Sequence, residues 1–296
     1  MNVVLACDVD PVLPHVLSCP SRDEIWKCLD LLDDLMDAAG AEIPPITWLI
    51  RSDESVRFAS GDFASGYLAK KPLWKSLQSR GHELGWHMHL LSFDASSGCF
   101  EFDQAPAWLA EAHRALAVHF DVRATRTGWD YADNMLFEKF ESFGIRVDLS
   151  ALPGNIVWQK AGTRRFVVDW LRCAAEPYHP STDDYQRTGN LDLLEIPITQ
   201  FSNTAAGIVK RALWRSRNGC WAFGGIANKT KLLTDRWDRL PTQRSDRRVW
   251  AFYFHPEDLS DAGLRNFQHN LRLLKELPDV QFLTATAARD ALLAHC

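Results

Sequence analysis

Gly81-His82-Glu83-Leu84-Gly85-Trp86-His87-Met88-His89 is the stretch that says most about how this chain folds. A glycine typical of a helix end is followed by a charged-to-apolar transition and then by two histidines one residue apart. In an extended strand, residues i and i+2 point to the same side, so both imidazoles would face one cavity. The stretch therefore predicts a buried strand over residues 83–89 that ends in a chelating histidine pair, rather than two unrelated packed or surface histidines.

Outward from this stretch, short apolar runs alternate with longer amphipathic ones, a pattern typical of α/β proteins. The expected strands are Val3–Cys7, Ile46–Ile50, Glu83–His89, Ala124–Arg126, Arg146–Leu149, Leu193–Ile196, Val249–Phe254 and a last one from Val280. The expected helices are Arg22–Ala39, Tyr67–Ser79, Ala107–His119, Ala132–Phe143, Leu259–Glu276 and one at the end of the chain. Seven or eight βα units closing into a barrel, in a single domain over residues 1–296, is the simplest arrangement.

Two inserted segments interrupt the alternation. Residues 153–192 are polar and rich in turn residues, and we expect loops and short strands laid over one barrel face. Residues 205–248 carry eleven Lys and Arg against three Asp. Such a basic run is either a solvated face or a surface for an anionic glycan, a lipid-linked sugar or a membrane.

The bulk composition bounds the class of protein. The 296 residues are 46% hydrophobic and 24% charged, as in a globular protein with a sizeable core, and the formal net charge is -5. Since binding to phosphates needs a basic surface, this balance argues against nucleic acid as the main partner.

The compartment is inferred from cysteine usage and from the first residues. Seven scattered cysteines without a CxxC spacing favour free thiols in a reducing compartment. The opening Met1–Asp8 lacks a basic region and reaches a charge after a short apolar run, so we expect a buried strand rather than a signal peptide. No stretch approaches the roughly 18 apolar residues of a membrane span. We expect a cytoplasmic protein of undetermined oligomeric state.

Ionisable residues collect at the ends of the predicted strands, where barrel enzymes carry their catalytic groups. Asp8 and Asp10 share one side of an extended chain and need a cation between them, although a turn or helix-capping pair before Pro11 remains the alternative. His255 follows a late strand and, titrating near neutrality, could protonate a leaving amine. Arg126 could orient a carboxylate through its two-pronged guanidinium, and Asp148 falls in the fifth strand.

At these residues the chain resembles the polysaccharide deacetylases, carbohydrate esterase family four. The matching segments, in chain order, are Asp8-x-Asp10, Ile46-Thr47-Trp48-Leu49, Gly81–His87, Arg126-Thr127-Gly128-Trp129, Gly144–Ser150, Leu194-Glu195-Ile196-Pro197 and Phe254-His255-Pro256. The resemblance covers some 250 residues. It implies a distorted (β/α)7 barrel and a metal-dependent hydrolase that removes an N-acyl group, such as acetyl, from an amino sugar in cell-surface polysaccharide or lipopolysaccharide biosynthesis.

The resemblance also implies a role for each site residue. Asp8 matches the catalytic base, Arg126 the arginine that orients it and His255 the general acid, while Asp148 falls in a segment lining the site. Asp10 and His87 match ligands of a divalent ion, with zinc as the first candidate. The family's second ligand histidine lies four residues after the first, where this chain has Leu91, so we expect His89 to replace it.

Substrates expected in this compartment are an N-acylated sugar, a nucleotide sugar or a lipid-linked glycan, with Trp86, Trp129 and Trp170 as stacking walls or as plain core residues. Three alternatives stay open. The barrel could be a metal-free, inactive scaffold that binds glycans, it could belong to another class of hydrolase using a His-x-His pair, or it could be a membrane-surface partner recruited through residues 205–248.

Overall fold

The structure, a computed structural model, describes residues 1–11, 25–32, 36, 43–199, 226, 249–259, 261–277 and 279–294. Of the basic segment 205–248, only Ile226 belongs to this part of the chain, so the proposals made for that segment lie outside the described residues. The helix expected over residues 22–39 falls only partly inside it and contains the 3-10 turn Lys27–Leu29. No helix in the described ranges is long and apolar enough to cross a membrane.

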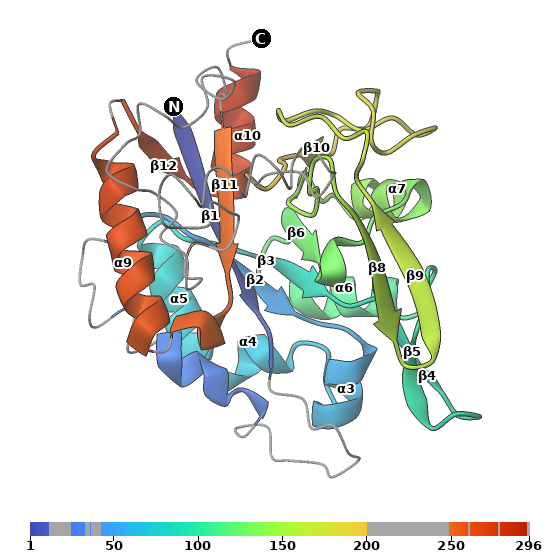
Figure 1. The fold of residues 1–296 in the computed structure, drawn as a ribbon. Helices are drawn as coiled ribbons and strands as arrows, with labels where there is room; N and C mark the ends of the chain where they lie inside the picture. Colours follow the sequence, from blue (N-terminus) through green and yellow to red (C-terminus); the bar gives the residue numbers. More distant parts are fainter. Residues whose placement is uncertain are drawn as a thin grey trace.

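A curled, mostly parallel sheet forms the centre of the fold (Figure 1). Its strands in sheet order are β10 (Leu194–Glu195), β7 (Val147–Asp148), β6 (Ala124–Thr127), β3 (Glu83–Met88), β2 (Thr47–Arg51), β1 (Asn2–Val9) and β11 (Val249–Phe254). A parallel bridge between Ile198, just past β10, and Ala251 of β11 links the two ends of this row. The expected distorted seven-stranded barrel is therefore confirmed, its ring closed at one seam by a single bridge.

An additional strand, β12 (Gln281–Leu283), pairs with Asn2–Val4 of β1, while β2 pairs with Ala6–Val9 of the same strand. A strand has only two edges, and the other edge of β1 is paired with β11. The strand expected from Val280 thus pairs with the first residues of β1, on the same edge that β2 occupies further along the strand. It extends the sheet but is not one of the seven barrel strands.

Helices flank the sheet (Figure 1). They are α3 (Glu54–Ser60), α4 (Ser65–Ala69), α5 (Lys71–Ser79), α6 (Leu109–Ala117), α7 (Asn134–Ser142), α9 (Asp261–Lys275) and α10 (Ala285–Leu293). The single helix expected over residues 67–79 is two, because Pro72 has no N–H to donate and begins a new first turn in α5. Gly81 and Gly144 follow α5 and α7 with φ of 85° and 83°, the left-handed conformation expected of these helix stops.

Two antiparallel hairpins extend from the barrel on the flank opposite α9 (Figure 1). The first joins β4 (Leu91–Asp94) to β5 (Cys99–Phe102) and was not expected. The second joins β8 (Ile156–Ala161) to β9 (Arg164–Asp169) and fulfils the expectation of short strands in the 153–192 segment. The turn of the second hairpin is anchored by the Glu101 carboxylate, which accepts hydrogen bonds from the Thr163 and Arg164 N–H groups.

The alternation of side chains along each strand separates the buried residues into two clusters. Side chains such as Val4, Ala6 and Leu49 face the barrel interior together with residues of β6, β7, β10 and β11. Their sequence neighbours, such as Leu5 and Trp48, face the flanking helices and form the larger cluster. The interior side chains are mostly small or branched, so the barrel is filled and has no through-passage.

Gly85 is required by the close approach of β3 to β6. A Cβ at this position would lie 2.5 Å from the backbone oxygen of Ala124 and 2.7 Å from Leu49 Cδ2. We expect Gly85→Ala to lower the free energy of unfolding by about 3 kcal/mol, because the backbone of β6 cannot retreat without losing its pairing with β3.

Urea denaturation measures this effect, with Gly61→Ala as the comparison. Gly61 has a φ of 79° and open space around its missing Cβ, so an alanine there costs only backbone strain, about 1 kcal/mol. Equal losses in the two variants would contradict the packing explanation.

Candidate metal centre and catalytic site

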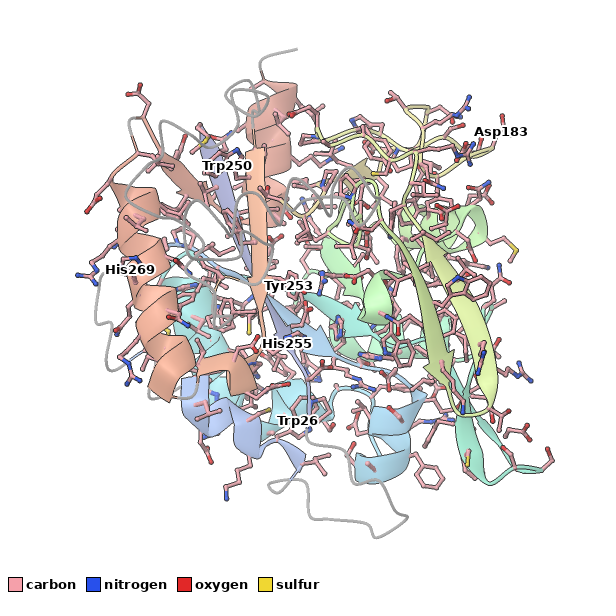
Figure 2. All side chains as sticks on the ribbon, viewed as in Figure 1. Trp26, Asp183, Trp250, Tyr253, His255 and His269 are labelled. Atoms are coloured by element: carbon pink, nitrogen blue, oxygen red, sulfur yellow. The ribbon has the colours of Figure 1, made fainter. Side chains whose placement is uncertain are left out.

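On each barrel strand, the side chains that face the interior continue beyond the apolar core to the carboxyl end of the strand. Two residues after Ala6 comes Asp8, two after Gly85 comes His87, and two after Ala124 comes Arg126. On β11 the row runs through Tyr253 to His255 (Figure 2). Because parallel strands end at the same edge, these side chains meet at one mouth, as the sequence predicts.

Asp10, His87 and His89 form a cluster with the geometry of a metal centre. One ligand atom from each lies within 4.8 Å of the others. Asp10 Oδ1 is 3.5 Å from His87 Nε2 and 3.8 Å from His89 Nε2, and the two imidazole rings are nearly perpendicular. This set of one carboxylate and two imidazoles suits zinc and leaves further coordination positions for water or a substrate oxygen.

The protonation of His87 also fits a metal. Its Nδ1 lies 2.7 Å from the backbone oxygen of Arg126, which can only accept, so Nδ1 carries the proton and Nε2 the lone pair. Nε2 is buried and has no hydrogen-bond partner among the described residues. Burial lowers the pKa of His87 and lowers that of His89 to about 3, so both rings are neutral near pH 7. The lone pair of His87 Nε2 is therefore buried, has no donor within the described chain and lies 3.5 Å from Asp10 Oδ1, and a cation bound between the two would interact with both.

His89 reaches the cluster although β3 ends at Met88. Its N–H donates to Asp53 Oδ2 at 3.0 Å, and its ring packs edge-on against Trp129 with 4.4 Å between ring centroids. Leu91, at the position where the resembled family has its second histidine, is a buried residue at the start of β4, paired with Phe102. His89, two residues after His87, therefore lies in the candidate cluster.

Arg51 and Asp53, at the end of β2, were not singled out from the sequence. Arg51 Nη1 donates to Asp10 Oδ1 at 3.1 Å and its Nε to Asp53 Oδ2 at 2.7 Å, the same oxygen that holds the His89 N–H. One ion pair thus fixes two of the three candidate ligands. Arg51 and Asp53 have the same i, i+2 spacing at a strand end as Asp8 and Asp10, which is the signal that could have identified them.

The charge of Asp10 follows from this arrangement. Burial alone would raise the pKa of its carboxyl group, but His87 and the permanently charged Arg51 hold that pKa well below its usual value. Burial would also raise the pKa of Asp53, and Arg51 again lowers it. Both carboxylates are therefore ionised.

Asp8 is held by Arg126. The guanidinium donates to Asp8 Oδ2 through Nη1 and to Asp130 Oδ1 through Nη2, and its Nε donates to the backbone oxygen of Leu149 at 3.1 Å. It also lies 4.0 Å over the Tyr253 ring. Asp8 Oδ1 is buried without a hydrogen-bond partner among the described residues, so one oxygen is anchored and the other faces the mouth.

Asp130 is a third residue that was not singled out from the sequence. Both Trp129 and Asp130 have φ near +60°, a left-handed conformation that is strained for residues with side chains. The Asp130 backbone oxygen accepts from Trp170 Nε1 at 2.7 Å, which helps to hold this turn. The strained turn places the Asp130 carboxylate on Arg126 and the Trp129 ring on His89.

His255 stands across the mouth from the metal cluster. Its Nε2 lies 3.7 Å from Asp8 Oδ2 and 3.9 Å from Asp10 Oδ2, while Nδ1 lies 3.2 Å from Asp258 Oδ2. Burial would lower the pKa of His255, but its hydrogen bond to the Asp258 carboxylate and the charges of Asp10 and Asp258 raise it above its ordinary value. A protonated imidazole near neutral pH is the state a general acid requires.

Asp148 is not brought into this group. Its neighbours Val147 and Leu149 face the barrel interior, so the side chain of Asp148 points to the opposite face. There it accepts hydrogen bonds from Ser150 N–H at 2.9 Å and Ser150 Oγ at 3.1 Å and lies beside Glu195. Burial, and then the neighbouring Asp148, raises the pKa of Glu195 well above its usual value.

The three candidate stacking tryptophans differ in position. Trp86 is fully buried, with Nε1 donating to Ser52 O, and Trp170 is fully buried behind Asp130. Trp129 is half-buried and contacts His89. Of the three, Trp129 is the one that the structure places at the site.

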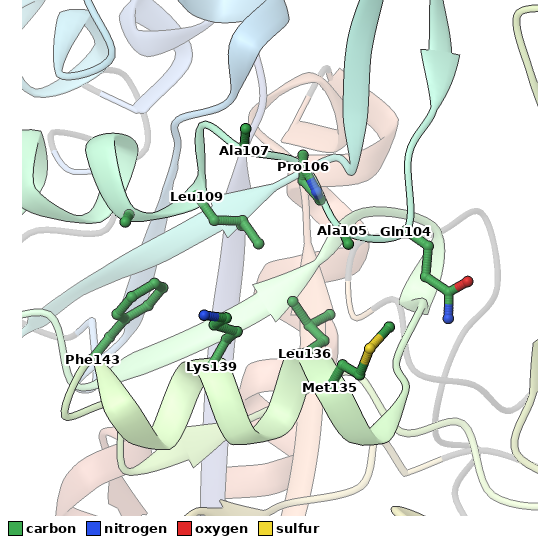
Figure 3. A pocket seen from close by; sticks show the side chains of 10 residues that line it. Gln104, Ala105, Pro106, Ala107, Leu109, Met135, Leu136, Lys139 and Phe143 are labelled. Carbon is green, nitrogen blue, oxygen red and sulfur yellow. The ribbon is translucent and has the colours of Figure 1, made fainter.

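A cavity of about 270 Å³ lies elsewhere, between the loop before α6 and helix α7 (Figure 3). It is lined mainly by apolar side chains, including Pro106, Leu109, Leu136 and Phe143, with Lys139 beside them. None of the mouth residues takes part in it, so the candidate centre rests on the converging side chains and not on this cavity.

Comparison with known proteins supports the architecture. No protein-family model and no curated protein sequence matches the chain. A structure assigned as a polysaccharide deacetylase from Mycobacterium smegmatis aligns over 99% of this chain and 90% of its own, with 14% identity and a TM-score of 0.54. Puue allantoinase aligns over 99% and 91%, with 14% identity and a TM-score of 0.55. A structure assigned as a polysaccharide deacetylase from Pseudomonas aeruginosa PAO1 aligns over 99% and 91%, with 12% identity and a TM-score of 0.55.

The Arg51–Asp53 pair predicts a specific loss of metal affinity. Asp53→Asn keeps a good N-cap for α3 but removes the charge that fixes Arg51 and weakens the hold on the His89 N–H. We expect zinc to bind about 10- to 100-fold more weakly, as measured by competition with a chromophoric chelator. Asp133→Asn, which makes the same change at the N-cap of α7, is the matched control and should leave the affinity unaltered.

Gly128 gives a second, steric prediction. A Cβ there would lie 2.3–2.4 Å from Cδ2, Cγ and Nε2 of the His89 ring. We expect Gly128→Ala to displace His89 and weaken cobalt binding at least about tenfold, seen in the visible absorption of the cobalt-loaded protein. An unchanged cobalt spectrum and affinity in a folded variant would mean that His89 is not a ligand.

Proposed function

The chain has the fold of the polysaccharide deacetylases, and from that premise we propose that it is a metal-dependent hydrolase removing an N-acyl group from an amino sugar. The observation that carries the proposal is the mouth itself. An arginine-held carboxylate, Asp8, and a carboxylate-held imidazole, His255, lie 3.7 Å apart beside the Asp10, His87 and His89 cluster. Amide hydrolysis needs a base, an acid and a means of stabilising an oxyanion, and this arrangement supplies all three.

A divalent ion, with zinc as the first candidate, would be held by Asp10, His87 and His89 and would supply carbonyl polarisation and a more acidic water. The residues present fit such an ion because two neutral imidazoles and an ionised carboxylate converge, and the buried Nε2 of His87 has no hydrogen-bond partner among the described residues. Arg51 keeps Asp10 ionised and oriented, and Asp53 keeps His89 in place.

Asp8 is the base in the proposed reaction. Its Oδ2 is fixed by Arg126, and its unpaired Oδ1 takes the proton of the attacking water. The Arg126 contact preserves the negative charge that a base needs, and Asp130 balances the second arm of that guanidinium.

His255 is the acid. As the carbon–nitrogen bond of the amide breaks, its Nε2 proton passes to the departing nitrogen, leaving a free sugar amine and a carboxylate. Asp258 holds Nδ1 and so directs Nε2 into the mouth. Without this proton the amine would have to leave as an anion, and cleavage would stall.

The proposed substrate class rests on the fold and on the cytoplasmic compartment that we also propose. Trp129 beside His89 offers an apolar face suited to a sugar ring. We propose a cytoplasmic setting and an N-acylated nucleotide sugar or lipid-linked glycan of cell-surface polysaccharide or lipopolysaccharide synthesis. The convergence of Asp10, His87 and His89 favours this proposal over an inactive scaffold. The allantoinase with the same fold supports a second candidate, a small amide substrate, which a substrate panel can test.

Amine release from N-acetylated sugars, nucleotide sugars and allantoin, with and without added zinc or cobalt, tests the function. We expect activity on one of the sugar classes, lost on chelation and restored by metal. Asp8→Asn and His255→Ala should each lower kcat by about a hundredfold or more while Asp121→Asn, a change at an exposed carboxylate, has no effect. Chelator-resistant release, or equal rates in all three variants, would refute the proposed chemistry.

The raised pKa of His255 gives a pH prediction. The acid is active when protonated, so kcat/KM should fall as pH rises through the His255 pKa. Removing the Asp258 charge in Asp258→Asn withdraws a contact that raises this pKa, so the alkaline limb of the profile should move to lower pH. A profile that stays in place, measured on the same substrate, would show that Asp258 does not act on the proton of His255.

A further inference from the structure

The hairpin β8–β9 has one face packed against the protein and one exposed. On the packed face, Phe166 stacks on Phe102 with 3.9 Å between centroids and also contacts Trp129, and Val168 is buried. Trp129 in turn contacts His89. The hairpin is therefore part of the wall that supports the candidate metal centre.

The other face of the hairpin carries a row of exposed apolar and basic side chains, and no helix or sheet of the described residues covers Trp158. Strand alternation places on this face Ile156, Trp158, Lys160, Arg165, Val167 and Asp169, with Leu171 following. Trp158 is 74% exposed, Leu171 42% and Ile156 38%, three of the few large apolar side chains exposed in the described chain.

Near the turn, the charged side chains on this face are both positive. Lys160 lies directly opposite Arg165 in the strand pairing, next to the pair formed by Trp158 and Val167. Neither cation makes an ion pair with any described residue, and like charges directly opposite each other destabilise a hairpin. Two facing cations on a chain of net charge -5 indicate an anionic occupant.

We propose that this face of β8–β9 is an accessory binding surface for a negatively charged glycan, with a sugar ring stacked on Trp158 and an acidic group between Lys160 and Arg165. That the ligand is a glycan rests on the proposed function, whereas its negative charge rests on the two cations. The opposite face of the same hairpin contacts Trp129 through Phe166, so the hairpin carries this surface on one side and supports the candidate site on the other.

Each contact has a physical reason. The flat indole of Trp158 matches the apolar face of a sugar ring, and the neighbouring Val167 widens that platform. A carboxylate or phosphate on the next sugar would relieve the repulsion between Lys160 and Arg165, a gain that a neutral glycan cannot supply. The surface therefore selects acidic polymers over neutral ones.

Affinity electrophoresis of the full chain, in gels containing polygalacturonate or dextran and in the presence of a metal chelator, tests the proposal. We expect retardation by polygalacturonate and none by dextran. Trp158→Ala should weaken the apparent affinity about two- to tenfold, and Lys160→Ser with Arg165→Ser by a similar factor or more at low salt. The double variant should also melt no lower than the unaltered chain, since it removes a like-charge pair.

Matched controls lie on helices away from the hairpin. Lys75→Ser with Arg80→Ser removes two exposed charges around the end of α5, and Val118→Ala trims an exposed apolar side chain after α6. Both should be retarded like the unaltered chain. Equal affinity of the hairpin variants and these controls would overturn the proposal.

Two further outcomes are decisive. Vesicles containing phosphatidylglycerol offer the same negative charge without a sugar, and binding to them but not to polygalacturonate would overturn the glycan proposal in favour of a membrane surface. Amine release from a small N-acetyl sugar should be unchanged in the hairpin variants. Because binding is measured without metal, a failure of the hairpin proposal leaves catalysis untouched, and a failure of catalysis leaves the binding result standing.

Discussion

The candidate site depends on one constraint, that side chains two residues apart on parallel strands point to the same side and parallel strands end together. This constraint brings Asp8, His87, Arg126 and His255, which are far apart in the chain, to one mouth. The same constraint excludes Asp148, which is one position out of phase with its interior-facing neighbours. The phase of each barrel strand thus determines which of its side chains reach the site.

Bringing two aspartates to one mouth requires compensation, and the structure provides a separate arginine for each. Arg126 holds Asp8 and leaves one oxygen free, whereas Arg51 holds Asp10 beside the two histidines. The two arginines are in turn fixed by Asp130 and Asp53. Each arginine is thereby neutralised from both sides, which makes it possible to bury several charges in a small volume.

The position of His89 shows how a changed spacing can preserve a ligand set. The strand ends at Met88, and the N–H of His89 donates a hydrogen bond to Asp53. This contact fixes the backbone so that the imidazole of His89 lies beside Asp10. Gly128 leaves the space for this ring, and Trp129 closes on it from a strained turn. His89 is thus held in the candidate cluster by elements that are distant from it in the chain.

Local sequence patterns determined which segments of the described chain are strands and helices, and which strand-end side chains share a face, because hydrophobic periodicity and i, i+2 spacing are properties of neighbouring residues. They predicted seven or eight βα units and a group of strand residues that included Asp8, Asp10, His87, His89, Arg126 and His255. Only the tertiary structure decided the roles of Arg51, Asp53 and Asp130 and the placing of Asp148. Those depend on which strands become neighbours and in which register, and pairings such as Arg51 with Asp10, 41 positions apart, and His89 with Asp53, 36 positions apart, leave no periodic trace in the chain.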